Sequence, residues 1–239
     1  MANLTQLRML EQLNAFLFVN KPAGIAFSTV VKTVKRKFNL VKVGHGGSLE
    51  TAASGLLVLL INDANKFTGE IMGADRVYTG TFELGKATNT GDRYGKVISN
   101  SDLLPDDLAM ANALKDFRGD IFQTESRYCS IRKEGACDYE VADTGEHKPF
   151  LTHVYRFDVT RLSERTFSFS VSATKSLIVR TLIDDLGKTL GCGAILTSLC
   201  REKIGNHTLK DAVDFDRVLR CGAGDFVSLT CQISTVLSK

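Results

Sequence analysis

The sequence predicts an α+β fold: a single domain over residues 1–239, with a mixed, largely antiparallel sheet flanked by helices. Segments such as 167–173 alternate apolar and polar residues with the period of a strand. Other segments, such as 108–117, carry apolar residues at the spacing of an amphipathic helix. Strands and helices do not alternate regularly along the chain, which argues against a parallel βαβ sheet. No segment in the middle resembles a linker, which favours one domain.

The first third of the chain predicts a buried strand, a helix and a second apolar segment. Residues 16–19 are apolar and are followed by a stop signal, Lys21-Pro22-Ala23-Gly24. The helix after this signal should be capped by Ser28 or Thr29. Its apolar positions recur at helical spacing and leave the basic residues on the opposite side: Val30, Val31, Val34 and Phe38. The longest apolar run, 56–61, is typical of a core segment.

The rest of the chain predicts further strands separated by helices. Asp106 and Asp107 should open a helix that Gly119 closes. A second helix is expected from about residue 177 to residue 186, with Gly187 near its end. The alternating or apolar segments expected as strands are 78–84, 155–160, 167–173 and, last in the chain, 226–233.

Charge is distributed unevenly although the net charge is only +3. One segment carries cations and no acid: Lys32, Lys35, Arg36, Lys37 and Lys42. Such a run is typical of a solvated helix face, and it is also what a surface that contacts phosphate groups requires. The run alone leaves both interpretations open.

The six cysteines include no C-x-x-C pair, so the spacing of a zinc ribbon is absent. The chain does not begin with a basic segment followed by an apolar run, and no apolar run is long enough to span a membrane. These features predict a cytoplasmic protein with reduced thiols, no bound metal and no membrane partner.

A glycine-rich stretch, Gly44-His45-Gly46-Gly47, precedes the apolar run. It lacks the Gly-Lys-Ser/Thr of a P-loop and the spaced glycines of a dinucleotide-binding fold. Taken alone, it is equally compatible with a tight turn before a core segment, and His45 alone is more often structural than catalytic.

A longer stretch around these glycines is more specific. Residues 43–57 read VGHGGSLETAASGLL. This stretch resembles the signature of the TruB-type pseudouridine synthases, G-H-x-G-[ST]-L-D-P-x-A-[ST]-G-[VL]-L. Further segments resemble motifs of that family in the same order, over residues 17–205: Lys21-Pro22 and Gly24; Asn65-Lys66-Phe67; Tyr78; Leu84-Gly85, Thr88, Thr90-Gly91-Asp92 and Gly95; Gln123, Tyr128, Gly135, Tyr139-Glu140 and Ala142; 180–187 and 191–194; Leu199 and Arg201.

The resemblance implies an α+β catalytic domain that isomerises a uridine in the T-loop of tRNA, at the position usually numbered 55. The reaction cuts the N-glycosidic bond, turns the uracil and rejoins it through carbon, and it needs no metal and no cofactor. It requires a base drawn out of its stack, a carboxylate nucleophile, an aromatic face and a cation that orients the carboxylate. The implied partner is the T-stem-loop of tRNA, and the protein is expected to be a monomer.

By position in the motifs, the resemblance implies that Glu50 is the carboxylate, Tyr78 the aromatic face and Arg180 the cation. His45 matches a histidine that helps to hold the everted nucleotide, and Leu199 matches an apolar residue packed near the base. These residue types suit the roles, because arginine can keep a carboxylate ionised and tyrosine offers both a ring and a hydroxyl. Without the resemblance, Tyr78 would be a half-buried strand residue and Arg180 an ion-pair partner on a helix surface.

The sequence departs from the family signature at the catalytic position, where Glu50 stands in place of aspartate and Thr51 in place of proline. The extra methylene moves the carboxylate by about an ångström unless the backbone retreats, and a misplacement of that size can cost about a hundredfold in rate. The resemblance therefore leaves two functions open. One is a working synthase with a glutamate nucleophile. The other is a tRNA-binding protein of the same fold that has lost most catalysis and acts as an RNA chaperone.

Many relatives carry a small C-terminal RNA-binding domain, whereas about 34 residues follow Gly205 here. No separate domain of that kind is therefore expected, and the catalytic domain should bind tRNA by itself. The candidate RNA-binding residues, besides His45 and Leu199, are the cations Lys21, Lys35, Arg36, Lys37, Lys42 and Arg132.

Overall fold

The computed structural model describes residues 9–124, 128–133, 136–141 and 148–238, without the side chains between residues 125 and 147. Its contacts divide the chain into two compact units. The first unit comprises residues 1–74 and 201–239, and the second comprises residues 75–200. Each unit is described by itself below. The single domain expected over residues 1–239 stays a prediction.

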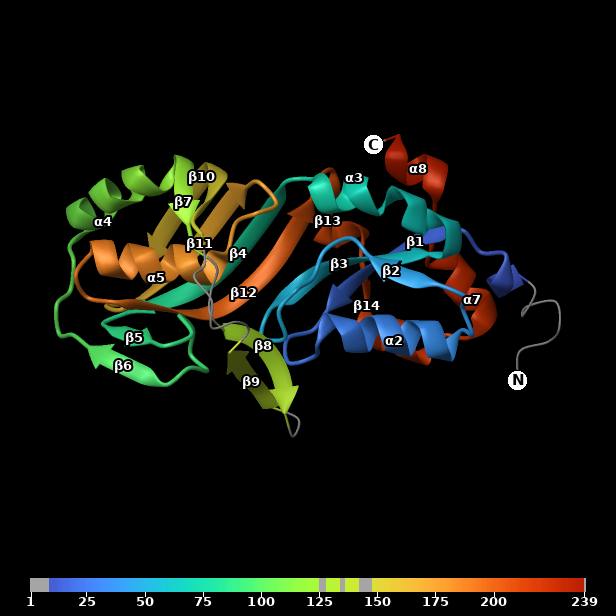
Figure 1. Cartoon of the computed structure of the whole chain (residues 1–239), viewed down its shortest axis with the longest axis horizontal. Helices are drawn as coiled ribbons and strands as arrows, with labels where there is room; N and C mark the ends of the chain where they lie inside the picture. Colours follow the sequence, from blue (N-terminus) through green and yellow to red (C-terminus); the bar gives the residue numbers. More distant parts are fainter. Residues whose placement is uncertain (1–8, 125–127, 134–135, 142–147, 239) are drawn as a thin grey trace. The chain divides into compact units, whose positions relative to one another are not determined.

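The first unit is built around two long antiparallel strands, β1 (Ala15–Lys21) and β3 (Ser54–Ile61), paired from Ala15 opposite Ile61 to Lys21 opposite Gly55. Its other elements, in chain order (Figure 1), are α2 (Phe27–Lys37), β2 (Val43–His45), η1 (Asn62–Phe67), α3 (Thr68–Gly73), the end of β12 (Ala194–Ile204), β13 (His207–Thr208), η3 (Leu209–Asp211), β14 (Val213–Asp214), α6 (Phe215–Arg220), α7 (Ala223–Ser228), β15 (Cys231–Gln232) and α8 (Ile233–Leu237). Strand β14 pairs with β1 in parallel, whereas β2 and β15 pair antiparallel with β3 and β1.

Both faces of this strand pair are buried, which is why β1 and β3 are almost entirely apolar. Leu17 and Leu57 belong to the face covered by α2, α6 and α7. Phe16 and Leu56 belong to the opposite face, covered by η1, α3 and α8. Figure 1 shows α2 and α7 on one side of the strands and α3 and α8 on the other. The first unit is therefore a three-layer α/β/α arrangement.

The second unit contains one sheet in the order β4-β11-β10-β7, with every neighbouring pair antiparallel. Its elements, in chain order, are β4 (Arg76–Leu84), β5 (Lys86–Thr88), β6 (Val97–Asn100), α4 (Asp107–Ala113), η2 (Leu114–Phe117), β7 (Gly119–Gln123), β8 (Tyr128–Lys133), β9 (Ala136–Val141), β10 (Phe150–Arg161), β11 (Thr166–Ala173), α5 (Val179–Thr189) and the larger part of β12. Strands β5 with β6 and β8 with β9 form two separate hairpins.

One face of this second sheet carries the core of the unit. In β11 the apolar residues point into the core and the serines between them do not, as the alternation predicts: Phe167, Phe169, Val171 and Ala173 are buried. Helices α4 and α5 cover this face through Met110, Leu182 and Leu186. The predicted α+β class and the mixed, largely antiparallel sheet are confirmed. No helix among the described residues is long and apolar enough to cross a membrane.

The strand predicted over residues 226–233 is wrong. The segment forms the end of α7, the two-residue strand β15 and the beginning of α8. Phe226 is fully buried and stacks on Phe38 of the α2 C-cap, with ring centroids 3.7 Å apart. Its apolar side chains therefore serve a short helix against the core, a distinction that a short apolar run cannot make.

The helix boundaries also differ from the predictions in part. Helix α2 begins at Phe27, so neither Ser28 nor Thr29 caps it, and its N-cap Ala26 makes no side-chain hydrogen bond. The predicted cap of α4 is confirmed, since the Asp106 carboxylate accepts from the Ala109 N–H at 2.7 Å. Helix α5 begins and ends later than predicted, and Gly187 lies within it. A Cβ at Gly187 would lie 2.1 Å from the Ala194 nitrogen, so glycine permits the close packing of α5 on β12.

Candidate active site

Glu50 lies in the first unit, on the loop between β2 and β3. Its carbonyl oxygen accepts from the Ala53 N–H at 3.1 Å and closes a turn. The neighbouring Leu49 and Thr51 are buried, at 4% and 3% exposure, whereas Glu50 is only partly buried. The loop is thus anchored on both sides of a side chain that remains accessible.

A buried arginine holds the first half of this loop. Arg201, at the end of β12, is 2% exposed and donates from Nη1 to the Ser48 oxygen at 2.8 Å. It also donates from Nη2 to the Gly47 oxygen at 3.2 Å and from Nε to the Leu56 oxygen at 2.9 Å. The planar guanidinium thereby fixes carbonyl groups on both flanks of Glu50.

A buried lysine holds the second half of the loop. Lys21, the last residue of β1, is fully buried, and its Nζ donates to the Ala53 oxygen at 2.5 Å and to the Thr51 oxygen at 3.5 Å. It also donates to the carbonyl groups of Pro22 and Ile25. This burial does not support the predicted RNA contact of Lys21, because an ammonium enclosed by carbonyl groups is not presented to phosphate. Its role in the structure is to hold the Glu50 loop.

Arg201→Met should lower the free energy of unfolding by about 3 kcal/mol, because three carbonyl oxygens lose their buried, charged donor. Urea unfolding followed by circular dichroism measures this change. The matched control is Arg217→Met in α6, an exposed arginine of the same unit, which should change stability by less than about 0.5 kcal/mol. Equal losses in the two variants would contradict the anchoring role of Arg201.

His45 ends β2 and lies at the start of the same loop. Its Nδ1 accepts from the Gly47 N–H at 3.3 Å, and its ring meets Phe27 edge-on, with centroids 4.8 Å apart. Burial lowers the pKa of His45 below its ordinary value of 6.5, and the positive charge of Arg201 adds to this effect. At neutral pH the imidazole is therefore uncharged, with its proton on Nε2, where it can donate to a ligand.

In the second unit, Arg180 lies in the first turn of α5 and is 4% exposed. Its Nη1 donates to the Thr90 oxygen at 2.9 Å. The start of this helix is fixed by Gln123 of β7, whose side-chain amide accepts from the Ile178 N–H at 2.9 Å and donates to the Ile178 oxygen at 3.1 Å. The alternative of a helix-surface position for Arg180 is thus wrong, because the guanidinium is buried.

Tyr78 and Leu199 belong to the core of the second unit. Tyr78 lies on β4 opposite Val171 of β11 and is 8% exposed. Leu199 of β12 is partly buried and packs against the same apolar cluster. The predicted catalytic residues therefore lie in both units, with Glu50 in the first and Tyr78 and Arg180 in the second.

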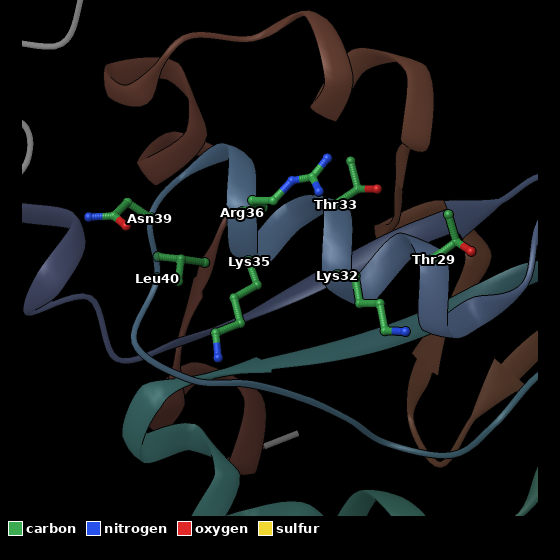
Figure 2. A pocket seen from close by; sticks show the side chains of 7 residues that line it. All are labelled: Thr29, Lys32, Thr33, Lys35, Arg36, Asn39 and Leu40. Atoms are coloured by element: carbon green, nitrogen blue, oxygen red, sulfur yellow. The ribbon is translucent and has the colours of Figure 1, made fainter.

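The cations of the acid-free segment 32–42 fall into separate groups in the structure. One pocket, of about 600 Å³, lies on α2 and the residues after it. Figure 2 shows the side chains that line it: Thr29, Lys32, Thr33, Lys35, Arg36, Asn39 and Leu40. Lys37 instead donates to the Leu219 oxygen and lies over the Phe38 ring. Lys42 lines another pocket, of about 500 Å³, together with Glu11 and Asp63. Arg132 lies in β8, and its side chain is outside the described part of the chain.

The pocket on α2 concentrates positive charge without compensating acid. Its three cations are all exposed, and in the described residues none of them forms an ion pair with a carboxylate. Figure 2 shows Lys32 and Lys35 extending to one side of the helix and Thr33 and Arg36 to the other. With two threonine hydroxyls and an amide as further donors, these residues present a positively charged surface along α2, as contacts to successive phosphate groups require.

Sequence reasoning did not assign a role to Arg201. The signal available was its place in the motif two residues after Leu199, which indicated a family position but not a contact. The three carbonyl groups that Arg201 binds are more than a hundred residues away in sequence, as the separations of 145, 153 and 154 residues show. A local pattern cannot reveal such a partner set.

Comparisons with known proteins agree with the motifs. Residues 35–179 match the family model of the TruB family pseudouridylate synthase, N-terminal domain. The chain is 35% identical over 212 residues to tRNA pseudouridine synthase B of Opitutus terrae, covering 87% of this chain and 88% of that protein. It is also 35% identical over 207 residues to tRNA pseudouridine synthase B of Burkholderia pseudomallei, covering 85% and 68%.

Among solved structures, the fold resembles a chain of a Cbf5–Nop10–Gar1 complex, with a TM-score of 0.71 and 20% identity over 95% of this chain and 62% of that one. A chain of an H/ACA ribonucleoprotein bound to a substrate RNA is similar at a TM-score of 0.64 and 21% identity, over 90% and 54%. At these identities the likeness concerns the fold alone. The family model and the curated relatives go further: this chain belongs to the TruB family of pseudouridine synthases.

Proposed function

We propose that this chain isomerises a T-loop uridine of tRNA, at the position usually numbered 55, to pseudouridine, with Glu50 as the nucleophile. Its family and its curated relatives support a pseudouridine synthase, which is an isomerase. The observation that carries the proposal is the loop of Glu50, whose backbone is held by the buried cations Lys21 and Arg201. A fixed backbone presents the carboxylate in a constant position, as nucleophilic catalysis requires.

Each proposed role follows from the chemistry of the side chain. With the uridine everted, the Glu50 carboxylate assists breakage of the bond between C1′ and N1, and the uracil turns so that C5 bonds to C1′. The C5 proton then leaves and N1 gains one, so atoms balance within an isomerisation. Tyr78 holds the uracil, and its hydroxyl accepts the C5 proton while it releases its own proton to water. Arg180 orients the carboxylate, and the Nε2–H of His45 with Leu199 holds the nucleotide.

The proposed reaction transfers no electrons and adds no group, so it needs no redox or group-carrying cofactor, and each proposed role is performed by a side chain without a metal. The proposed partner is the T-stem-loop of tRNA. We place the protein in the cytoplasm, where tRNA is modified, and expect it to act as a monomer without a membrane partner.

The pocket on α2 (Lys32, Lys35 and Arg36) is the proposed phosphate-binding surface. Changing all three residues to alanine should weaken binding of a T-stem-loop and flatten the salt dependence. The slope of log affinity against log salt is negative and should become less steep by about 2 to 3, since each of the three lost phosphate contacts removes roughly 0.7 to 0.9. Fluorescence anisotropy at several salt concentrations measures both quantities.

Lys37→Ala is the matched control for this triple variant, because the Lys37 ammonium is directed to the Leu219 carbonyl group rather than into the pocket. It should leave the slope almost unchanged. If the triple variant also keeps the native affinity and slope, the pocket is a solvated helix face and the proposed surface is wrong.

Tyr78→Phe should bind RNA with native affinity and slow isomerisation by about a hundredfold, because the ring remains while the hydroxyl that accepts the C5 proton is lost. Single-turnover conversion and eversion of a fluorescent base analogue separate the two steps. Equal loss of binding and conversion would place Tyr78 in the fold, in keeping with its 8% exposure, and not in the chemistry.

The T-loop specificity is tested with a set of stem-loop RNAs that each carry one uridine. The native chain should convert the uridine at the T-loop target position and leave uridine at other loop positions unchanged, as mapped by chemical labelling of pseudouridine. Conversion at all loop positions alike would contradict the proposed substrate. The alternative function is an RNA chaperone of the same fold, and the observation that favours it is Glu50 in place of the family's aspartate. This alternative predicts that every stem-loop is bound and none is converted.

A further inference from the structure

The turn between β5 and β6 in the second unit is held by several hydrogen bonds and exposes an arginine next to a tyrosine. The Asn89 N–H donates to the Lys96 carbonyl oxygen at 3.0 Å, and the Asn89 side-chain oxygen accepts from the Lys96 N–H at 2.8 Å. Gly91 and Arg93 are joined to Leu196 of β12, at 3.0 and 3.1 Å. Residues 89–96 are therefore closed at the base and fastened along the middle.

The single acid of this turn is directed inward. Asp92 is 3% exposed, and its carboxylate accepts from the Thr90 hydroxyl at 2.8 Å and from the Tyr94 N–H at 3.0 Å. The Thr90 carbonyl oxygen in turn accepts from Arg180, so the turn is in direct contact with a residue proposed to act in catalysis. The turn is therefore also fixed to the first turn of α5.

The outward side of the turn combines a cation with an aromatic ring. Arg93 and Tyr94 are exposed, with Tyr94 at 42%, and the Arg93 guanidinium lies 5.1 Å from the centre of the Tyr94 ring. Arg93 also donates to the Tyr94 hydroxyl at 3.1 Å. With Lys96, which is exposed as well, the charges that the turn presents to solvent are all positive.

We propose that Arg93 and Tyr94 bind an unstacked nucleotide of the substrate RNA, distinct from the uridine that is isomerised. The base stacks on the Tyr94 ring, and Arg93 contacts the adjacent phosphate. Unpaired RNA is recognised by stacking on aromatic rings and arginine planes, together with phosphate contacts. An exposed ring already lined up with a guanidinium on a rigid turn offers both without ordering a loop on binding. This inference rests on the proposed function for the identity of the RNA.

The test uses the full chain and a fluorescent T-stem-loop RNA. Tyr94→Ala should weaken binding by about tenfold, whereas Tyr94→Phe should stay within about threefold of native, because base stacking needs the ring and not the hydroxyl. Arg93→Ala should reduce the salt slope by roughly 0.7 to 0.9. Phe122→Ala and Arg156→Ala, an exposed aromatic and an exposed arginine of the same unit, are the matched controls and should bind as native does.

A scan with abasic sites identifies the contacted nucleotide. At that one position, removal of the base should weaken native binding and leave the Tyr94→Ala variant unaffected, since the two changes remove the same contact. Native affinity in both Tyr94→Ala and Arg93→Ala would overturn the inference and show that the two side chains only stack on each other. Equal loss in Tyr94→Phe and Tyr94→Ala would also overturn it, because stacking would not be the cause.

Conversion of uridine in the same samples separates this inference from the proposed function. At saturating enzyme, Tyr94→Ala should convert the bound RNA at the native rate, so only the concentration for half-maximal rate rises. If Tyr94→Ala weakens RNA binding but the native chain makes no pseudouridine, the binding site is upheld and the proposed function is contradicted. If the native chain converts uridine and Tyr94→Ala changes neither binding nor conversion at any enzyme concentration, the proposed function is upheld and the binding site is contradicted.

Discussion

Glu50→Gln should stop the conversion of uridine to pseudouridine, lowering the single-turnover rate by about a thousandfold or more. The amide has nearly the size of the carboxylate but carries no charge and is a poor nucleophile. The contacts that hold the loop involve the carbonyl groups of Gly47, Ser48, Thr51 and Ala53, so they survive the change. RNA affinity should therefore stay within about threefold of native.

Glu70→Gln is the matched control, an exposed glutamate in α3 of the same unit, and it should retain the native rate. Thermal unfolding of both variants shows whether the fold is kept. Native turnover that survives Glu50→Gln would remove Glu50 from the chemistry and would leave its position in the family motif without a catalytic meaning.

Glu50→Asp should lower the rate by about a hundredfold, because the pinned loop cannot move to compensate for a side chain shorter by one methylene. Thr51 stands where the family has proline, is buried, and its carbonyl oxygen accepts from the Gly24 N–H at 2.7 Å. We infer that this segment is adapted to glutamate and that aspartate would place the carboxylate short of the sugar.

Single-turnover conversion of one T-stem-loop by native, Glu50→Asp and control Glu70→Asp proteins measures this effect. A faster Glu50→Asp variant would contradict the adaptation and would show that the loop still has the geometry of the family's aspartate. The direction of the change thus distinguishes a chain adapted to glutamate from one that is handicapped by it.

The fold could be predicted where burial follows a local period. The alternation of apolar residues predicted the strand β11, and their helical spacing predicted the helix α2. Both elements are present and bury these residues on one face. The segment 226–233 could not be assigned in this way. Its apolar residues are too few to distinguish a strand from short helices, and its structure depends on Phe226 stacking on Phe38, far away in sequence.

The candidate site was predictable from the motif only as a set of positions. The motif placed Glu50 beside the glycine-rich stretch, but it did not reveal that Lys21 is enclosed by carbonyl groups or that Arg201 holds the loop. Both facts depend on contacts between segments remote in sequence. The cations of segment 32–42 are a further example. The order of charges along α2 does not predict that Lys37 donates to a carbonyl group of α6 while Lys35 lines a pocket.

The most direct test of the central claim is release of tritium by the native chain from a T-stem-loop labelled at C5 of its uridine. Forming the bond from C5 to C1′ expels the hydrogen at C5, so each isomerisation frees one label into water. We predict release of the label from the target uridine in a single turnover, with pseudouridine as the nucleoside recovered. Tight binding of the RNA without release of label would contradict the account and would identify the chain as an RNA-binding member of the family without isomerase activity.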